Sequence, residues 1–426
     1  MTTRLTALDQ ILLQLTSLFP RTFAPTARKR LASSRLSLAT EAGRNCEQRL
    51  LVDVSIIAQQ NAGTGIQRVV LAILGQLLID PPHGWTVEAI YATRKSPYRY
   101  ANDFVSRTFG IDASSEDTLV KVHRGDLFLG LDMASRILSR RKRDLALWQK
   151  QGVCFVFIVY DLLPALHPDW FTQRARKAFA QWLTTLAIHA TALLCISNSA
   201  ADETRNWFLT HYKLDSADLP ISWFHLGADF EGGATQNEAS ATNNCVATTV
   251  QPTLLMVGTV EPRKGYEQAI AAMELLWSQG NDVKLVIVGK RGWNVDDLVA
   301  RIERHPELNN RLLWFPDTTD QQLINLYQQA TGVVMASNGE GFGLPLIEAA
   351  KFGVPVLARD IKVFREIAGD NVSYFSGTTA SNLAAPLQSW LLEMIAGKAP
   401  DIRELHWLTW AESATHLKRK LVSLRA

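Results

Sequence analysis

The chain has 426 residues, of which 47% are apolar and 20% are charged. This composition excludes an intrinsically disordered chain, and the length fits two folded domains better than one. The formal net charge of +3 is too small to indicate a nucleic-acid-binding protein, and the four cysteines include no CxxC pair typical of a zinc site.

The N-terminal segment, residues 1–48, is predicted to be a basic extension. The first 50 residues carry eight basic and three acidic side chains. No apolar run reaches the about 18 residues that a membrane span needs, and no signal-peptide pattern is present. We therefore expect a cytoplasmic protein. Its extension could contact the anionic inner face of a membrane, stay solvated, or form a helix packed on the first domain.

Residues 49–227 are predicted to form a Rossmann-like domain, because short apolar runs alternate there with longer amphipathic runs. The predicted strands are 50–57, 86–91, 126–131, 153–160, 192–196 and 221–224. The predicted helices include 66–79, 172–189 and 199–212. Uniformly apolar strands separated by helix-length crossovers indicate a parallel sheet covered by helices on both faces.

A second alternation of the same kind occupies residues 252–406, after a polar segment, 228–251, that is typical of a flexible linker. Its predicted strands are 253–257, 284–288, 311–315, 333–336 and 354–358, and its predicted helices are 266–279, 297–304, 321–330 and 346–352. The last segment, 407–426, holds one more helix. The pattern predicts an α/β protein with two doubly wound domains.

The most informative motif, Ser337-Asn-Gly-Glu340-Gly-Phe-Gly-Leu-Pro345, directly follows the predicted strand 333–336. Gly341 and Gly343 indicate a loop, and Pro345 indicates a first helical position. The loop therefore ends at a helix N-terminus beyond the carboxyl end of a parallel strand, where open α/β sheets bind ligands. Free backbone N–H groups and the helix dipole favour a diphosphate at such a position.

Two glutamates stand eight positions apart around this helix start. Glu340, before the helix, can reach sugar hydroxyls beside the phosphates. Glu348, placed by the pattern in the first helical turn, can accept hydrogen bonds from a ribose diol. Each glutamate alone also fits a surface charge or a residue that complements the helix dipole. Their combination with the glycines and the strand favours a binding site.

A second strand-to-helix loop follows the predicted strand 253–257 and reads Gly258-Thr-Val-Glu-Pro-Arg-Lys-Gly265. Arg263 offers a planar fork for phosphate oxygens, and Lys264 offers a mobile point charge. Alone, the loop fits an exposed basic turn equally well. Together with the glutamate loop on the same sheet edge, it predicts a second half of the diphosphate site.

The Glu–x7–Glu spacing around GFGLP, together with GTVEPRKG upstream, resembles the retaining glycosyltransferase family four, which has the GT-B fold. The similarity extends from about residue 50 to about residue 410. The resemblance implies that Arg263 and Lys264 grip the diphosphate of a nucleotide-sugar donor. It further implies that Glu340 contacts the transferred sugar and Glu348 binds the ribose. The remaining donor-binding residues it implies are Thr259, Gly341, Phe342, Gly343 and Leu344.

The resemblance also covers the N-terminal half and the last helix. Gly63 and Gly65 are similar to the family's glycine loop that faces the donor phosphates, although a purely structural turn fits equally well. Asp161 matches an acceptor-site aspartate, but Tyr160 stands where many relatives have histidine, which removes an obvious general base. Asp161 also fits a turn before proline. The segment 407–426 resembles the helix that crosses back to the N-terminal domain.

These features predict a retaining glycosyltransferase that needs no metal or other cofactor, because basic side chains would take the place of a cation and no DxD pattern precedes a strand. The resemblance is strongest to bacterial enzymes of O-antigen and exopolysaccharide synthesis. It implies GDP-mannose as the first choice of donor, with UDP-hexoses or a deoxysugar donor as the next choices. The implied acceptor is a saccharide or lipid-linked saccharide. Open alternatives are a nucleotide-sugar epimerase, a phosphorylase, and a non-catalytic nucleotide-sugar-binding subunit of a polysaccharide assembly complex.

Overall fold

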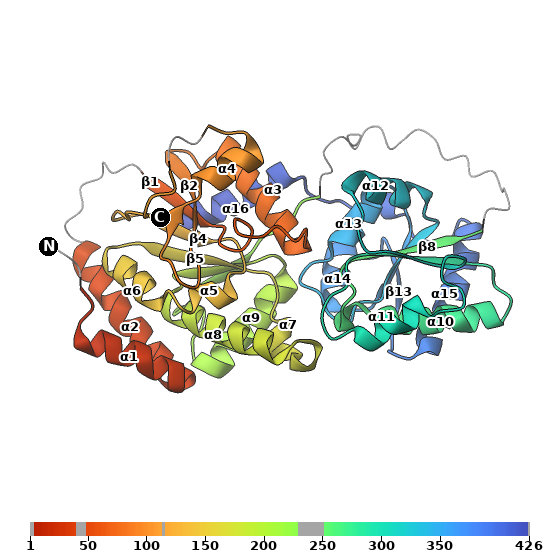
Figure 1. Cartoon of the computed structure of the whole chain (residues 1–426), viewed down its shortest axis with the longest axis horizontal. Coiled ribbons are helices and arrows are strands. Elements are labelled where there is room, and N and C mark those ends of the chain that lie inside the picture. Colours follow the sequence, from red (N-terminus) through yellow and green to blue (C-terminus); the bar gives the residue numbers. More distant parts are fainter. Residues whose placement is uncertain (1–3, 40–47, 113–115, 229–250, 425–426) are drawn as a thin grey trace. The chain divides into compact units, whose positions relative to one another are not determined.

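The computed structural model describes residues 4–39, 48–112, 116–228 and 251–424 (Figure 1). Contacts within the chain define two compact units. Unit 1 comprises Met1–Leu166, Gln173–Leu226 and Trp410–Ala426, and unit 2 comprises His167–Thr172 and Gly227–Thr409. Within the stretch 49–227 expected for the first domain, His167–Thr172 groups with unit 2 instead. The expected linker 228–251 lies outside the described residues except at its two ends.

Unit 1 is built on a sheet of the order β3-β2-β1-β4-β5-β6-β7, in which only β3 is antiparallel to its neighbour. The strands are β1 (Gln48–Asp53), β2 (Trp85–Tyr91), β3 (Arg99–Tyr100), β4 (Leu127–Gly130), β5 (Cys154–Val159), β6 (Ala192–Cys195) and β7 (Ile221–Trp223). The helices are α1 (Ala7–Leu18), α2 (Pro20–Ala39), α3 (Gly65–Ile79), α4 (Asn102–Phe109), α5 (Ser135–Leu138), α6 (Lys142–Lys150), α7 (Leu163–Leu166), α8 (Gln173–His189), α9 (Asn198–Tyr212) and α16 (Trp410–Ser423).

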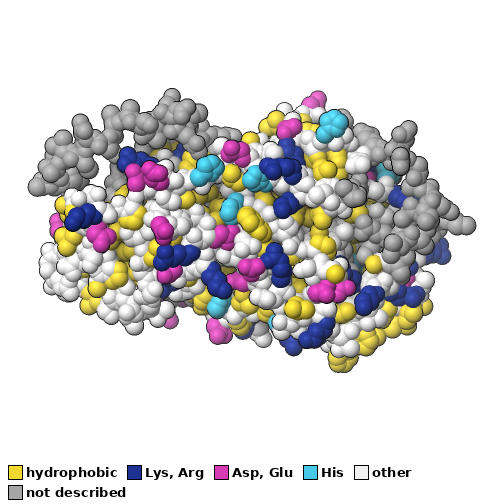
Figure 2. Space-filling view, turned by 180° about the vertical axis from the view of Figure 1, so that it is seen from behind, with side chains coloured by type: hydrophobic (Ala, Val, Ile, Leu, Met, Phe, Trp, Pro, Cys, Tyr) yellow, Lys and Arg dark blue, Asp and Glu magenta, His cyan; other side chains and the backbone are white. Residues whose placement is uncertain are grey.

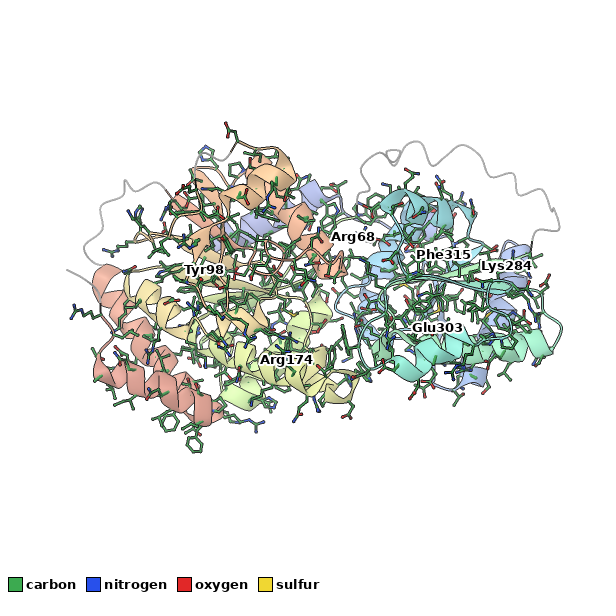
Figure 3. The ribbon with its side chains drawn as sticks, in the orientation of Figure 1. Arg68, Tyr98, Arg174, Lys284, Glu303 and Phe315 are labelled. Carbon is green, nitrogen blue, oxygen red and sulfur yellow. The ribbon has the colours of Figure 1, made fainter. Side chains whose placement is uncertain are left out.

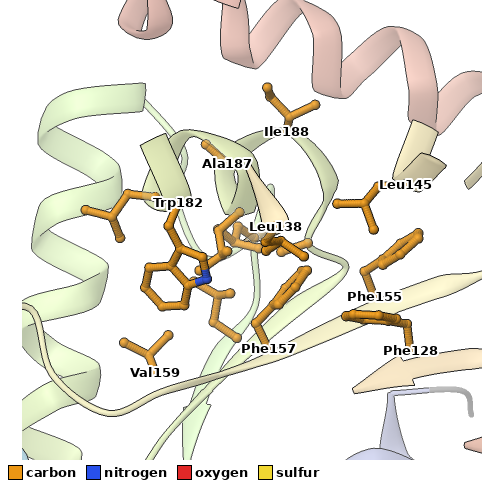
Figure 4. Packing of buried hydrophobic residues seen from close by; sticks show 14 of the residues in the cluster. Phe128, Leu138, Leu145, Phe155, Phe157, Val159, Trp182, Ala187 and Ile188 are labelled. Atoms are coloured by element: carbon orange, nitrogen blue, oxygen red, sulfur yellow. The ribbon is translucent and has the colours of Figure 1, made fainter. Parts of the chain in front are cut away.

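Aromatic side chains fill the space between this sheet and α8. Every residue of β5 is buried, as expected for a central parallel strand. Phe128 of β4 lies 5.4 Å from Phe155 and 5.7 Å from Phe157 between ring centroids, and Trp182 of α8 packs in the same cluster (Figure 4). These large side chains set the distance between sheet and helix, so the strand ends that carry polar residues are held on a rigid layer.

The first described residues form helices of unit 1 rather than a separate basic extension. The α1 helix begins with a capping box in which Thr6 and Asp9 bond to each other's backbone N–H groups. The α2 helix packs against α6, α8 and α9. Arg28 of α2 donates to the carbonyl oxygens of Ala190 (2.6 Å) and Asp218 (2.5 Å). Part of the basic charge in this segment therefore serves packing within unit 1.

Unit 2 holds a fully parallel sheet of the order β10-β9-β8-β11-β12-β13. The strands are β8 (Thr253–Val257), β9 (Lys284–Val288), β10 (Leu312–Phe315), β11 (Gly332–Met335), β12 (Val356–Arg359) and β13 (Ser373–Phe375). The helices are α10 (Tyr266–Ser278), α11 (Asp296–Glu303), α12 (Asp320–Gln329), α13 (Leu344–Lys351), α14 (Lys362–Ala368) and α15 (Ala380–Ile395). In Figure 1, α10 and α15 lie on one side of the sheet and α12 and α13 on the other. The predicted pair of parallel, doubly wound sheets is therefore confirmed.

Candidate active site

The loop between β8 and α10 depends on a glycine at its end. After β8 the chain passes through a short 3-10 helix, Pro262–Lys264, and turns into α10 at Gly265, which has φ +71°. A Cβ built on Gly265 would lie 2.9 Å from the Cβ of Ala336 and still closer to its carbonyl oxygen. Only glycine therefore lets this loop pack directly on the end of β11.

This packing brings the two predicted loops of unit 2 into contact. The Arg263 guanidinium pairs with the Glu340 carboxylate and also donates to the Gly339 carbonyl oxygen at 3.0 Å. The Lys264 Nζ lies 2.5 Å from the other oxygen of Glu340. Ser337 donates its hydroxyl to that same oxygen at 2.8 Å. The sequence placed these groups on one sheet edge, and the structure joins them in one cluster.

The charges in this cluster balance. The Nη2 of Arg263 also lies 2.7 Å from the carboxylate of Glu261, so two cations meet two carboxylates. Burial raises the pKa of Glu340, but the charges of Arg263 and Lys264 outweigh this effect and lower the pKa to about 2. Glu340 is therefore an ionised carboxylate whose side chain is only 8% exposed, and not a loop surface charge.

The helix start after Glu340 has the predicted glycine. Gly343 has φ +109° and forms the N-cap of α13, with Pro345 in the first turn. Phe342 is buried, and the loop from Gly341 to Leu344 runs from Glu340 into the helix. A helix start of this kind is suited to a phosphate, and contact of these residues with a donor stays a prediction.

The second glutamate does not lie where the sequence pattern placed it. Glu348 is the fifth residue of α13, one position later than the pattern placed it, because the helix begins at Leu344 and not at Pro345. Its side chain is buried, with 1% of the residue exposed, and accepts a hydrogen bond of 2.7 Å from the Tyr327 hydroxyl. It does not act as a first-turn charge that complements the dipole. Its contact with a ribose stays a prediction, as does a donor contact of Thr259.

Residues 246–399 match the family model described as glycosyl transferases group 1, and this match covers the whole cluster. This part of the chain is therefore similar to the group 1 glycosyltransferases. Over 395 residues it is 38% identical to the serotype-specific mannosyltransferase WbdA of Escherichia coli, a match that covers 91% of this chain and 47% of WbdA. The chain thus spans about half the length of the curated relatives it matches.

Solved structures show the fold of this chain. Sucrose-phosphate synthase from Thermosynechococcus elongatus superposes with a TM-score of 0.61 at 18% identity, over 89% of this chain and 99% of that one. HepE of Anabaena, solved with UDP and glucose, gives 0.55 at 15% identity, over 88% and 96%. The predicted GT-B fold is confirmed by these likenesses.

The group 1 domain contains a buried arginine that sequence reasoning missed. Arg359 ends β12, is 6% exposed and donates twice to the Ala336 carbonyl oxygen, at 3.1 Å from Nε and 2.9 Å from Nη2. It also donates to the Gly377 carbonyl and to the side chain of Gln268 in α10. Burial lowers the pKa of Arg359. A lone arginine closing an apolar strand was the only available signal.

Arg359 connects the two loops that carry Lys264 and Glu340 through the backbone. The carbonyl that it holds, on Ala336, is the same group against which Gly265 packs. The next residue, Ser337, bonds to Glu340. Arg359 therefore fixes the point from which both loops depart, and we infer that it positions the cluster without touching it.

The predicted residues of unit 1 lie at the carboxyl ends of its strands. Gly63 has φ +67° and precedes Thr64, whose side chain caps α3, with Arg68 on the first turns of that helix (Figure 3). Asp161 accepts a hydrogen bond from its Leu163 neighbour's backbone at 3.0 Å, the turn-forming contact that was the alternative for this residue. Roles of Gly63, Gly65 and Asp161 toward donor or acceptor stay predictions.

The tyrosine that replaces the family's histidine is part of the core. Tyr160 is buried and donates to the Leu131 carbonyl oxygen at 2.8 Å. Burial and the charge of Asp132 raise its pKa well above the ordinary value, so Tyr160 is no general base.

Beside Tyr160 lies a buried carboxylate pair that the sequence did not reveal. Asp53 accepts from the backbone N–H of Ser55 (2.9 Å) and from the hydroxyl of Tyr98 (3.0 Å; Figure 3). Asp132 accepts from two backbone N–H groups of the same turn, those of Ile56 and Ile57, both at 2.8 Å. Together the two carboxylates fix the turn that follows β1. The expected strand 50–57 ends at Asp53 for this reason.

Within the residues described, no group of at least three His, Cys, Asp or Glu side chains is arranged to hold a metal ion. No described helix is long and apolar enough to cross a membrane. The expectation that the group 1 domain works without a metal stays a prediction.

Proposed function

We propose that this chain transfers a hexose with retention of configuration from a nucleotide-diphosphate sugar to a saccharide or lipid-linked saccharide. GDP-mannose is our first choice of donor, because the relatives with 37–38% identity are named mannosyltransferases. The observation that carries the proposal is the contact of Arg263 and Lys264 with Glu340, on the sheet edge where open α/β sheets bind ligands.

The arrangement supports separate roles for the two cations and for Glu340 during transfer. Negative charge builds on the diphosphate as the bond to the sugar breaks, and nearby cations in a partly buried site stabilise such charge. Arg263 and Lys264 are the cations at hand, and both are now paired with Glu340. A bound diphosphate would take over part of this pairing. The Glu340 carboxylate would then be free to accept hydrogen bonds from hydroxyls of the transferred sugar.

No metal is required in this proposal, since the basic pair supplies the positive charge that a divalent cation would otherwise provide. A lipid-linked acceptor would bring the protein to the inner face of a bacterial membrane as a peripheral, cytoplasmic enzyme. Surface polysaccharide synthesis is the process that fits such an acceptor.

The direct test is transfer from GDP-mannose, and from UDP-hexoses in parallel, to a mannose-terminated acceptor in the presence of EDTA, with the product anomer assigned by NMR. Lys264→Ala and Glu340→Ala should each lower turnover by about a hundredfold or more. Lys284→Ala is the matched control, because Lys284 stands at the amino end of β9, whereas the cluster lies at the carboxyl ends of the strands of the same sheet. Unchanged turnover in either site variant would refute the assigned roles.

Incubation with donor alone separates the alternatives. An epimerase would isomerise the donor without acceptor, and a phosphorylase would need inorganic phosphate for turnover. A non-catalytic subunit would bind the donor, seen as a rise in melting temperature, without turnover on any acceptor.

A further inference from the structure

The outermost helix of unit 1, α1, has two apolar faces. Its inner face carries Leu12, Leu13 and Thr16, which are buried against the rest of the unit. The helix contacts α2 and α6 on that side. Its acidic residue Asp9 is also buried and forms ion pairs with Arg30 and Lys150. These contacts fix α1 to unit 1, so its outer face is a defined surface.

The outer face of α1 is also apolar. Leu8 is 49% exposed, Ile11 50% and Leu18 71%, and the next residue, Phe19, is 58% exposed. The first three are spaced so that they share one side of an α-helix. We call these four residues the outer stripe. Large apolar side chains exposed as a group mark an interaction surface more often than single exposed ones do.

The charges around the outer stripe are basic. Residues 4–32 contain five basic side chains and one acidic side chain, and that single acid is the buried Asp9. Arg4, Arg21 and Lys29 are exposed. In the space-filling view, hydrophobic side chains and Lys or Arg gather at the corner of the molecule that α1 and α2 occupy (Figure 2). Within residues 4–32, the exposed apolar side chains are thus accompanied by exposed cations and by no exposed acid. Such a combination is complementary to a surface with an apolar interior and anionic headgroups.

We propose that the outer stripe docks on an anionic lipid surface, with α1 lying in the plane of the headgroups. Helices of this type insert apolar side chains at the boundary between headgroups and acyl chains while basic side chains contact anionic headgroups. This inference rests on the proposed use of a lipid-linked acceptor. It adds the surface that would hold the enzyme at the membrane. The stripe covers about three turns, so the predicted binding is weak, reversible and dependent on anionic lipid.

Co-sedimentation of the full chain with vesicles tests the proposal. Vesicles of phosphatidylglycerol and phosphatidylethanolamine at a ratio of about one to three should bind the protein, and phosphatidylcholine vesicles should not. Ile11→Gln with Leu18→Gln should weaken binding about tenfold or more, and so should Arg21→Gln with Lys29→Gln. The control is Ile395→Gln in unit 2, which removes an apolar side chain that is 81% exposed on α15 and should leave binding unchanged.

The outcomes separate the surface from the reaction. Equal binding to both vesicle types, or unchanged binding of the Ile11/Leu18 variant, would overturn the docking proposal. So would a doubled mass in light scattering that is lost in that variant, because the stripe would then serve a second copy of the chain. Transfer to a soluble saccharide should be the same in all variants, with unchanged melting temperature. Failed transfer with intact vesicle binding would contradict the proposed function alone.

Discussion

Replacing Gly265 by alanine should damage both stability and turnover, through two effects whose sizes can be separated. A non-glycine residue at φ +71° costs about 1–2 kcal/mol. The added Cβ would also press on the backbone of Ala336 at the end of β11. This backbone cannot move away freely, because β11 pairs with both β8 and β12. Overpacking of this kind typically costs about 1–3 kcal/mol more.

Gly280→Ala provides the matched control. Gly280 lies in the same unit, has φ +83° and has no atom within 4 Å of a built Cβ. This variant should lose only the about 1–2 kcal/mol of backbone strain, whereas Gly265→Ala should lose about 2–5 kcal/mol in all. The difference between the two variants isolates the contact with Ala336.

The assay is urea unfolding of both variants, followed by transfer rates at saturating donor. Displacing the Gly265 loop moves Arg263 and Lys264 relative to Glu340, and a misplacement of about 1 Å can cost about a hundredfold in rate. Gly280→Ala should transfer at the parent rate. If both variants lose the same free energy of unfolding and Gly265→Ala keeps the parent transfer rate, the close packing of this loop on β11 contributes neither to stability nor to turnover.

Arg359→Met should lower the free energy of unfolding by about 2–4 kcal/mol in urea titrations, because buried carbonyl groups lose their donors, and Arg359→Lys should recover part of that loss. If Arg359 positions the cluster, kcat of Arg359→Met should fall by a larger factor than KM rises. An unchanged kcat would contradict the positioning role. The pKa of Glu340 is lowered to about 2 in the folded state. Its charge therefore stabilises the fold above the ordinary glutamate pKa, and this stabilisation is lost as the pH falls through about 2. The free energy of unfolding of Glu340→Gln should therefore change less with pH in acid. Burial raises the pKa of Asp53 to about 7, so the folded state binds this proton more tightly than the unfolded chain and stability should fall as the pH rises toward 7. The same titration on Asp53→Asn should lack that slope, and an identical slope would show that Asp53 is not the group responsible.

The sequence predicted the sheets well because buried parallel strands have a local signature. The expected strand 253–257 and the observed β8 coincide, and the all-apolar run 153–160 contains β5. Helix starts with a local capping signal were equally accessible. Thr6 and Asp9 form such a signal at the start of α1, and the prediction of an extension did not use it. Charge counting alone treated this segment as an extension.

The site was predictable to the extent that each loop carries its own motif. Arg263, Lys264 and Glu340 stand in recognisable loops on one sheet edge, so their contact followed from topology. The contacts of Arg359 did not, because its partner Gln268 is 91 positions away and its other acceptors are backbone carbonyls that any residue could supply. The carboxylates Asp53 and Asp132 escaped for the same reason, since hydrogen bonds to backbone N–H groups leave no pattern in the sequence.

The order in which the chain is synthesised gives the last helix a distinct part in folding. Unit 1 is interrupted by Gly227–Thr409 and is completed only by α16, which packs on α3 through buried residues such as Leu417 and Leu421. A ribosome therefore releases all of unit 2 before the final piece of unit 1 emerges. Until then the part of α3 that α16 covers is exposed, and an incomplete first unit is open to aggregation or to chaperone binding. Unit 2 needs no segment that follows Thr409, so its fold can be completed before that of unit 1.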